Sequence, residues 1–172
     1  MIYRELSAGE FNDLASRILY EDNQLLVVNK KVGEIVQGDK TGDKPLSETV
    51  KEWIKETHAK PGNVFLGVVH RLDRPVGGLV VFAKTSKALT RLNEMFRRGD
   101  VHKTYWAITR NRPPHDEDLL THYITTVERN NKSYASATPK ADAKESRLKY
   151  RLLASGERYH LVEIDLLTGR KH

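Results

Sequence analysis

The sequence predicts an α+β fold, in which a mixed, largely antiparallel β-sheet core is flanked by a few helices. Short apolar segments rich in β-forming residues recur along the 172 residues. Most of the connections between them are too short for the crossovers that parallel strands need. Apolar residues make up 38% of the chain and charged residues 30%, which is typical of a folded globular protein.

The N-terminal part is expected to hold two helices around a short strand region. Residues 7–19 are predicted to be helical, because Ser7 and Glu10 fit a capping box ahead of a helical apolar pattern. Residues 24–30 are rich in β-forming residues and follow a plausible turn. Residues 45–56 show the apolar spacing of a second amphipathic helix.

The middle of the chain is expected to place a charged turn between two buried strands. Residues 64–70 and 79–83 read as the strands, and residues 71–78 as a glycine-containing turn. A helix is predicted to follow as far as Arg98, with Gly99 in the position of a C-terminal cap.

The remainder of the chain is predicted to be almost entirely β-structure. Residues 103–109 read as a strand, and residues 120–137 as a hairpin. Residues 146–154 and 159–167 alternate apolar and polar side chains, as half-buried strands do. Residues 1–172 are therefore expected to form a single domain.

The charge distribution points to a polyanion as the partner. The net charge is +6, which is also compatible with a merely soluble protein. The segment from Arg71 to Arg112, however, holds ten basic and three acidic residues, a balance of 10 − 3 = +7 that exceeds the net charge of the whole chain. Nucleic acid is therefore the first partner to consider.

Several function classes have little support in the sequence. Cysteine is absent, which excludes disulfides and Cys-ligated zinc and fits a cytoplasmic protein. No apolar run is long enough for a membrane span, and no signal peptide is evident. The histidines lack metal-ligand spacing, and phosphate-binding and serine-hydrolase motifs do not occur. Neither a metal nor a cofactor is expected.

The most unusual segment runs from His70 to Gly78, where Asp73 stands between Arg71 and Arg74. Flanking arginines favour the ionised form of a carboxylate, and an ionised carboxylate is a competent nucleophile. A salt-bridged structural turn is the alternative interpretation, because structural ion pairs are common.

Two further segments carry candidate site residues. Tyr105 follows Lys103 on a predicted strand, where a phenol could stack on a flipped base or exchange protons, or could simply be a core aromatic. Tyr105 and Trp106 must point to opposite faces. Arg170 follows a glycine at a strand end and could reach a carboxylate or a phosphate, unless it belongs to a frayed basic terminus.

Together these segments resemble the RluA-type pseudouridine synthases. That family carries an H-R-L-D-R turn, a K-x-Y-x-A strand and an L-x-T-G-R-x-H strand, which match residues 70–74, 103–107 and 166–172. The resemblance spans roughly residues 17–172 and implies the pseudouridine synthase fold. Two loops depart from the family pattern: Val76-Gly77-Gly78 stands in place of Thr-Ser-Gly, and Lys30-Lys31-Val32-Gly33 in place of Lys-Pro-x-Gly.

The resemblance also gives expectations about the limits of the domain. The family's domain continues beyond the position of His172, so the chain is expected to be truncated at its C-terminus. About twenty residues precede the opening motif, too few for the accessory N-terminal RNA-binding domain that some members carry.

The resemblance implies an isomerase that converts uridine to pseudouridine in structured RNA, either rRNA or tRNA, as a monomer and without a cofactor. It implies that Asp73 is the nucleophile, attacking the base or the sugar, that Arg170 pairs with it, and that Tyr105 stacks on the flipped base. RNA binding is expected to involve Arg71, Arg74 and Lys103, together with Lys87, Arg91 and Arg98 on one face of the predicted helix.

Two other functions are compatible with the sequence. A non-catalytic RNA-binding module on the same scaffold would keep the basic segment without the chemistry. A phosphate-handling enzyme with Asp73 as phosphoryl acceptor is the weaker alternative, because no metal-binding acids lie near Asp73 in the sequence.

Overall fold

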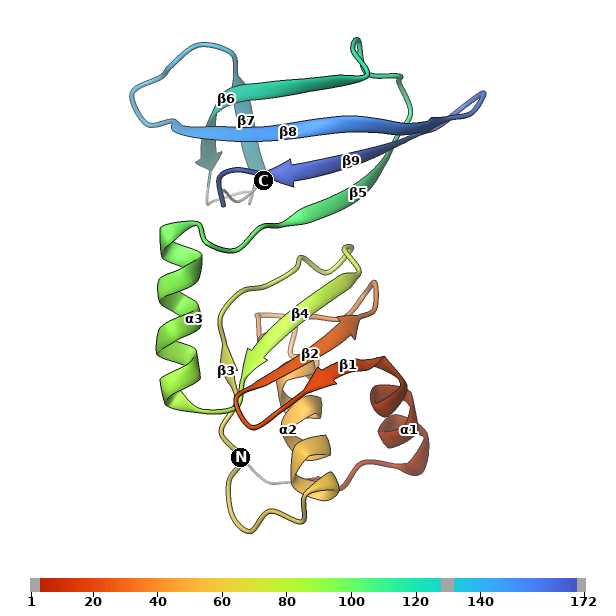
Figure 1. The fold of residues 1–172 in the computed structure, drawn as a ribbon, viewed down its shortest axis with the longest axis vertical. Coiled ribbons are helices and arrows are strands. Elements are labelled where there is room, and N and C mark those ends of the chain that lie inside the picture. The colour runs from red at the N-terminus through yellow and green to blue at the C-terminus, as the bar shows by residue number, and fades with distance from the viewer. Residues whose placement is uncertain (1–3, 128–131, 170–172) are drawn as a thin grey trace. The chain divides into compact units, whose positions relative to one another are not determined.

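The computed structural model describes residues 4–127 and 132–169. The chain separates into two compact units, Met1–Arg98 and Gly99–His172. Each unit is described by itself (Figure 1). The expectation that residues 1–172 form a single domain stays a prediction.

The first unit combines three helices with a four-stranded sheet. The strand order is β1-β2-β4-β3, and each pair of neighbouring strands is antiparallel. The elements are α1 (Ala8–Arg17), β1 (Ile18–Glu21), β2 (Leu25–Lys30), α2 (Leu46–Thr57), β3 (Gly67–Val68), β4 (Gly78–Ala83) and α3 (Ser86–Arg98).

Helix α1 begins where its capping residues place it. The Ser7 side chain accepts the Glu10 N–H, while the Glu10 carboxylate accepts the Ser7 N–H, so the predicted capping box is present. Helix α2 begins at Leu46 and turns Val50 and Ile54 into the core. The Phe11 ring stacks on Trp53 at a centroid distance of 6.0 Å, which joins the two helices.

The core of the first unit depends on the alternation of β2 and β4. Leu26 and Val28 on β2 are fully buried, as are Val80 and Phe82 on β4. The register pairs Val28 with Val80 and Lys30 with Gly78. The buried face of β2 therefore ends on a lysine, opposite a residue that has no side chain.

Strand β3 is much shorter than predicted, because only Gly67 and Val68 of residues 64–70 pair as a strand. Helix α3 packs closely here. A Cβ added to Gly67 would lie 2.8 Å from a methyl carbon of Leu89, so a larger residue at this crossing would have to displace the Leu89 side chain. The Thr85 hydroxyl accepts the N–H of Ala88 and caps the helix, and Gly99 follows with φ +80° in the left-handed region, as predicted.

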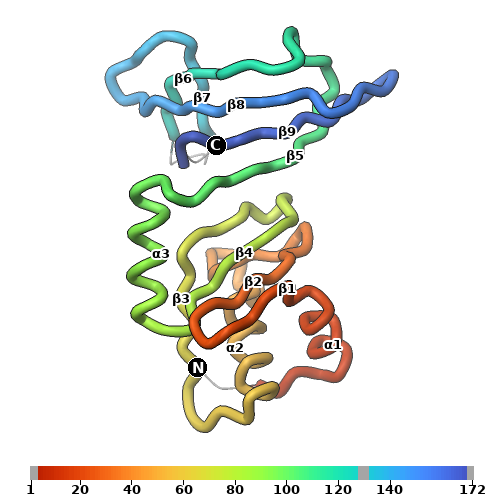
Figure 2. The backbone as a smooth tube through the Cα atoms, in the orientation of Figure 1, coloured from red at the N-terminus to blue at the C-terminus, as the bar shows by residue number. Residues whose placement is uncertain are grey.

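The second unit is built from strands alone within its described residues. The sheet order is β5-β9-β8-β6-β7, and all pairings are antiparallel. The strands are β5 (Thr104–Thr109), β6 (Glu117–Val127), β7 (Lys132–Ser136), β8 (Lys144–Ser155) and β9 (His160–Leu166) (Figure 2).

The prediction of an α+β fold with a largely antiparallel core is confirmed. The expected hairpin is also present, since β6 pairs with β7 from Tyr123↔Ser136 to Val127↔Lys132. Its connecting residues, 128–131, lie outside the described part of the chain.

Candidate active site

The turn that carries Asp73 lies between β3 and β4 in the first unit. Leu72 is buried, whereas Asp73 is exposed. The N–H of Val76 donates to the carbonyl oxygen of Asp73 at 3.0 Å, which closes a four-residue turn. The Asp73 carboxylate is thus presented to solvent from a turn whose preceding residue is anchored in the core.

A buried lysine, Lys30, holds this turn through hydrogen bonds to its backbone. Lys30 is only 1% exposed, and its ammonium donates to main-chain carbonyl groups. The distances from its Nζ are 2.6 Å to Val76 O, 3.0 Å to Lys31 O, 3.2 Å to Asp73 O and 3.4 Å to Arg74 O. A buried ammonium needs such acceptors, because an unpaired buried charge is very costly.

Burial and nearby carboxylates act on the pKa of Lys30 in opposite directions, and the effect of burial is the larger. Burial lowers the pKa of Lys30, and the charges of Glu34 and Asp73 oppose that shift. The Gly33 N–H adds a further tie, donating to the Arg74 carbonyl at 2.7 Å. The backbone of residues 73–76 is therefore held to residues 30–33 at several points.

Two glycines let the turn approach β2, in line with the sequence-based expectation. A Cβ at Gly77 would lie 3.3 Å from the Lys30 carbonyl oxygen, tighter than ordinary contact. Gly78 has φ +136°, a conformation that residues with a side chain rarely adopt.

The two arginines that flank Asp73 have different surroundings. The Arg74 Nη2 donates to Asp43 Oδ2 at 2.5 Å and to Thr41 Oγ1 at 3.0 Å. The hydrogen bond from Arg74 lowers the pKa of Asp43. Arg71 is exposed, and no ion pair or hydrogen bond involves the Asp73 carboxylate among the described residues. Arg74 thus pairs with Asp43 rather than with its sequence neighbour.

His70 supports the turn structurally. Its Nε2 accepts the N–H of Val81 at 3.0 Å, which requires an unprotonated Nε2. The imidazole also stacks on Phe96 of α3, with the ring centroids 5.0 Å apart. The His70 side chain thus provides an acceptor for the Val81 N–H of β4, at a position beyond the last paired residue of β3.

The tyrosine candidate lies on β5 in the second unit. Burial alternates along this strand, with Tyr105 half-buried and Trp106 69% exposed, so the two rings point to opposite faces as predicted. The Trp106 Nε1 donates to Glu163 on β9 at 3.2 Å. Tyr105 therefore occupies the more protected face of the sheet.

The segment that leads to Arg170 is anchored on β8, although Arg170 itself lies outside the described residues. The Thr168 hydroxyl accepts the Arg147 N–H at 3.0 Å, and the Thr168 N–H donates to the Arg147 carbonyl. A Cβ at Gly169 would lie 3.6 Å from the Lys103 Nζ. Lys103 and the chain before Arg170 are thus neighbours within the second unit.

The predicted site residues are therefore distributed over both units. Asp73, Arg71 and Arg74 share one turn of the first unit, whereas Tyr105 lies on β5 of the second unit and Lys103 directly precedes that strand.

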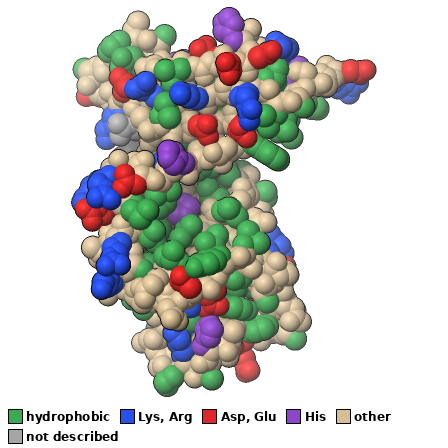
Figure 3. All heavy atoms as spheres, viewed as in Figure 1, with side chains coloured by type: hydrophobic (Ala, Val, Ile, Leu, Met, Phe, Trp, Pro, Cys, Tyr) green, Lys and Arg blue, Asp and Glu red, His purple; other side chains and the backbone are tan. Residues whose placement is uncertain are grey.

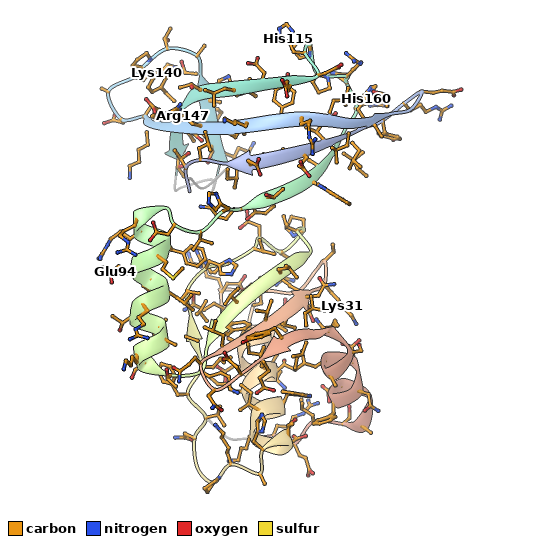
Figure 4. The ribbon with its side chains drawn as sticks, in the orientation of Figure 1. Lys31, Glu94, His115, Lys140, Arg147 and His160 are labelled. Carbon is orange, nitrogen blue, oxygen red and sulfur yellow. The ribbon has the colours of Figure 1, made fainter. Side chains whose placement is uncertain are left out.

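The predicted basic face is exposed on α3. Lys87, Arg91 and Arg98 are all exposed, and lysine and arginine side chains gather over this helix in Figure 3. Arg98 also lies 3.8 Å from Glu94, one helical turn earlier. Glu94 is labelled in Figure 4, on the outer side of the helix.

Sequence reasoning missed Lys30 as part of the site. A usable signal was present, since Leu26, Val28 and Lys30 recur with the period of two that places them on one face of a strand. A lysine in the last inward position must find acceptors, and the turn carbonyls supply them.

The described residues contain neither a cluster of metal-ligand side chains nor a helix that could cross a membrane. No three His, Asp or Glu side chains gather where they could hold one metal ion in that part of the chain. Among the helices of residues 4–127 and 132–169, none has the length and apolarity to cross a membrane.

Comparison with known proteins agrees with these features. The family described as "RNA pseudouridylate synthase" matches residues 24–172. The chain is 31% identical over 169 residues to tRNA pseudouridine synthase C of Vibrio parahaemolyticus, covering 90% of this chain and 65% of that protein. It is 32% identical over 163 residues to ribosomal large subunit pseudouridine synthase C of Escherichia coli, covering 92% and 48%.

A solved structure shows the same fold. Human RNA pseudouridylate synthase domain containing 4 superposes with a TM-score of 0.79 at 27% identity, covering 94% of this chain and 63% of that one. The chain spans about half to two thirds of the length of the curated relatives named here. The family match, covering most of the chain, and the three motifs show that this chain belongs to the RluA-type RNA pseudouridylate synthases.

Proposed function

We propose that this chain carries the catalytic site of an RNA pseudouridine synthase, in which Asp73 is the nucleophile. The observation that carries the proposal is the exposed Asp73 carboxylate on a turn whose backbone is fastened by the buried Lys30. A nucleophile gains most from being held in one orientation before the substrate arrives. A carboxylate that served only to close the turn would itself make hydrogen bonds within it.

The reaction is an isomerisation in which atoms and electrons balance without a cofactor. The bond between the uracil N1 and the sugar C1′ breaks, and a bond between C5 and C1′ forms. The C5 proton is lost, and N1 takes up a proton. The Asp73 carboxylate attacks either the base or the sugar carbon, and both routes need it ionised.

The substrate uridine must leave its stack to reach Asp73. Unstacking costs a few kcal/mol, so loops and single strands are the favoured targets. Tyr105 stacks on the flipped base and assists removal of the C5 proton, and Arg170 pairs with Asp73. These two roles are carried over from the family resemblance. Arg71 is the better candidate for a substrate phosphate than Arg74, because Arg74 is already paired with Asp43.

The RNA backbone is held by the basic residues. Lys87, Arg91 and Arg98 on α3 supply one cationic face, and Lys103 supplies a further charge beside Gly169. The substrate is rRNA or tRNA, in line with the names of the two bacterial relatives. We further propose that the protein acts as a monomer in the cytoplasm and needs no metal.

Tritium release tests this function. RNA labelled with tritium at uridine C5 loses the label when the new carbon–carbon bond forms. The full natural chain and its Asp73→Ala and Asp73→Asn variants are compared on labelled rRNA and tRNA. Release that is lost in both variants supports the nucleophile.

Matched measurements separate the alternatives. Lys40→Ala serves as a control, because Lys40 is an exposed residue of the first unit. Undiminished release by the Asp73 variants would refute the assignment. RNA binding without release from any RNA would favour a non-catalytic RNA-binding module.

A further inference from the structure

A partly buried ion pair connects α1 to the segment that follows β2. The Arg17 guanidinium donates from Nη1 to Glu34 Oε2 and from Nη2 to Glu34 Oε1, both at 3.0 Å. The Arg17 side chain is 11% exposed and that of Glu34 is 30% exposed. A bidentate arginine–carboxylate pair of this kind fixes orientation as well as distance.

The same pair also ties both ends of the segment at residues 29–34. The Glu34 Oε2 accepts the Lys31 N–H at 2.8 Å, and the Arg17 Nη1 donates to the Asn29 carbonyl at 3.1 Å. Asp13 on α1 strengthens the arrangement by pairing with both Arg17 and Lys31. Lys31 is labelled in Figure 4, where it lies at the end of β2.

This segment is the one that holds the Asp73 turn. The Lys30 Nζ lies 2.6 Å from Val76 O and 3.2 Å from Asp73 O, and the Gly33 N–H donates to Arg74 O at 2.7 Å. Within the described residues, the Glu34 carboxylate binds Arg17 and the Lys31 N–H and makes no hydrogen bond to the turn itself. Its route to the turn runs through Lys31 and the backbone on either side of it.

We propose that Arg17 and Glu34 are positioning residues for Asp73. Their ion pair fixes residues 29–34, and that segment in turn sets the orientation of the Asp73 turn. The inference rests on the proposed role of Asp73 as nucleophile. The alternative is an ion pair that contributes to fold stability alone, and the two readings predict different changes on substitution.

The size of the expected effect separates positioning from stability. An ion pair that served stability alone would change the melting temperature and leave the single-turnover rate of the folded protein unchanged. A misplacement of about 1 Å in a reacting group can cost about a hundredfold in rate. Breaking the pair is therefore expected to lower the single-turnover rate of protein that is still folded at the assay temperature.

The experiment compares Glu34→Gln and the milder Arg17→Lys with the wild type in the full natural chain. Arg4→Gln is the control, because it breaks an exposed arginine–glutamate pair at the opposite end of α1, in which the Arg4 Nη2 lies 2.7 and 2.8 Å from the two carboxylate oxygens of Glu10. The measurements are single-turnover tritium release from C5-labelled rRNA and tRNA, KM, the melting temperature and hydrogen exchange of the Gly33 amide.

The expected result is a single-turnover rate about ten- to a hundredfold lower in Glu34→Gln, with KM close to that of Arg4→Gln. Exchange of the Gly33 amide should be faster. The double variant Glu34→Gln/Lys30→Met should lower the single-turnover rate by less than the product of the two single reductions, because both residues act on one turn. An unchanged rate, or additive effects, would overturn the proposal.

If the wild-type protein released no tritium, the proposed function would be refuted. Hydrogen exchange of the Gly33 amide would still test whether the ion pair holds the Asp73 turn. Faster Gly33 exchange in Glu34→Gln would retain the holding role of the pair. Unchanged exchange would refute it.

Discussion

The Lys30 Nζ lies 2.6 Å from the carbonyl oxygen of Val76, so the last residue of β2 is bound to the end of the turn that carries Asp73. Replacing Lys30 by Met keeps most of the side-chain volume and removes every donor. We expect the free energy of unfolding to fall by about 1–3 kcal/mol, because several turn carbonyls lose their partner. Tritium release should fall with it. Thermal unfolding and single-turnover assays check this, with the exposed Lys40→Met as the control. Wild-type behaviour on both counts would show that the turn holds without Lys30.

His70 is expected to matter for stability through its bond to Val81. His70→Ala leaves the Val81 N–H without its acceptor and removes the ring that stacks on Phe96. We expect a loss of about 1–3 kcal/mol in the free energy of unfolding. Nitrogen chemical shifts should show the imidazole proton on Nδ1. The control is His102→Ala, at an exposed position. A proton found on Nε2 would contradict the assigned hydrogen bond.

Releasing Arg74 from Asp43 should strengthen RNA binding. Asp43→Asn removes the carboxylate that holds the guanidinium, so Arg74 becomes available to a phosphate. We expect the slope of log K against log salt to become steeper by about 0.7–0.9. Fluorescence anisotropy at several salt concentrations measures the slope. Asp116→Asn makes the same charge change by breaking the exposed pair with Arg112. An equal effect of both variants would mean that only net charge matters.

Neutralising the basic face of α3 should weaken RNA binding without changing sequence preference. Replacing Lys87, Arg91 and Arg98 by Gln would remove the three proposed phosphate contacts, so the salt slope should become shallower by about 2–3. The control is a triple Gln variant at Lys51, Lys55 and Lys60, which matches the change in charge. Unchanged affinity in the α3 variant would rule out this face as a backbone contact.

The capping box should make stability depend on pH in the acid range. Hydrogen bonds from the Ser7 side chain and backbone lower the pKa of Glu10 from 4.5 to about 2. The folded state therefore favours ionised Glu10. Its contribution is complete above the unfolded pKa near 4.5 and is lost as the pH falls through about 2. Melting temperatures between pH 5 and 2 should fall more steeply in the wild type than in Glu10→Gln. Parallel curves would contradict the assignment.

Local patterns in the sequence were enough to predict most elements of the fold. Ser7 and Glu10 marked the start of α1, Gly99 marked the end of α3, and the alternation of β8 and β9 marked two strands. The long strand expected at residues 64–70 was wrong. Val68 is the last residue of β3, and at Val81 the side chain of His70 takes the place of a neighbouring strand. A side chain that replaces a strand has no periodic signature.

The part of the candidate site that lies within the Asp73 turn could be predicted from the sequence. Asp73 and its glycines stood out in the sequence, and the turn presents the carboxylate to solvent. The pairing of Arg74 with Asp43 joins residues 31 positions apart, and Lys30 reaches across 46 positions to Val76. Such contacts depend on the register of β2 and β4, which a single sequence does not specify. The roles of Tyr105 and Arg170 stay predictions.

The close crossing at Gly67 and the stacking of His70 on Phe96 lock α3 to the strand that leads into the Asp73 turn. The cationic helix and the turn that carries the carboxylate therefore belong to the same packed unit. An RNA that bound both would have to bring its target uridine to Asp73 at the spacing that this packing sets. The enzyme would then select a uridine by how far it can be displaced from an RNA backbone bound on α3. This selection would come before any contact with the edges of the bases.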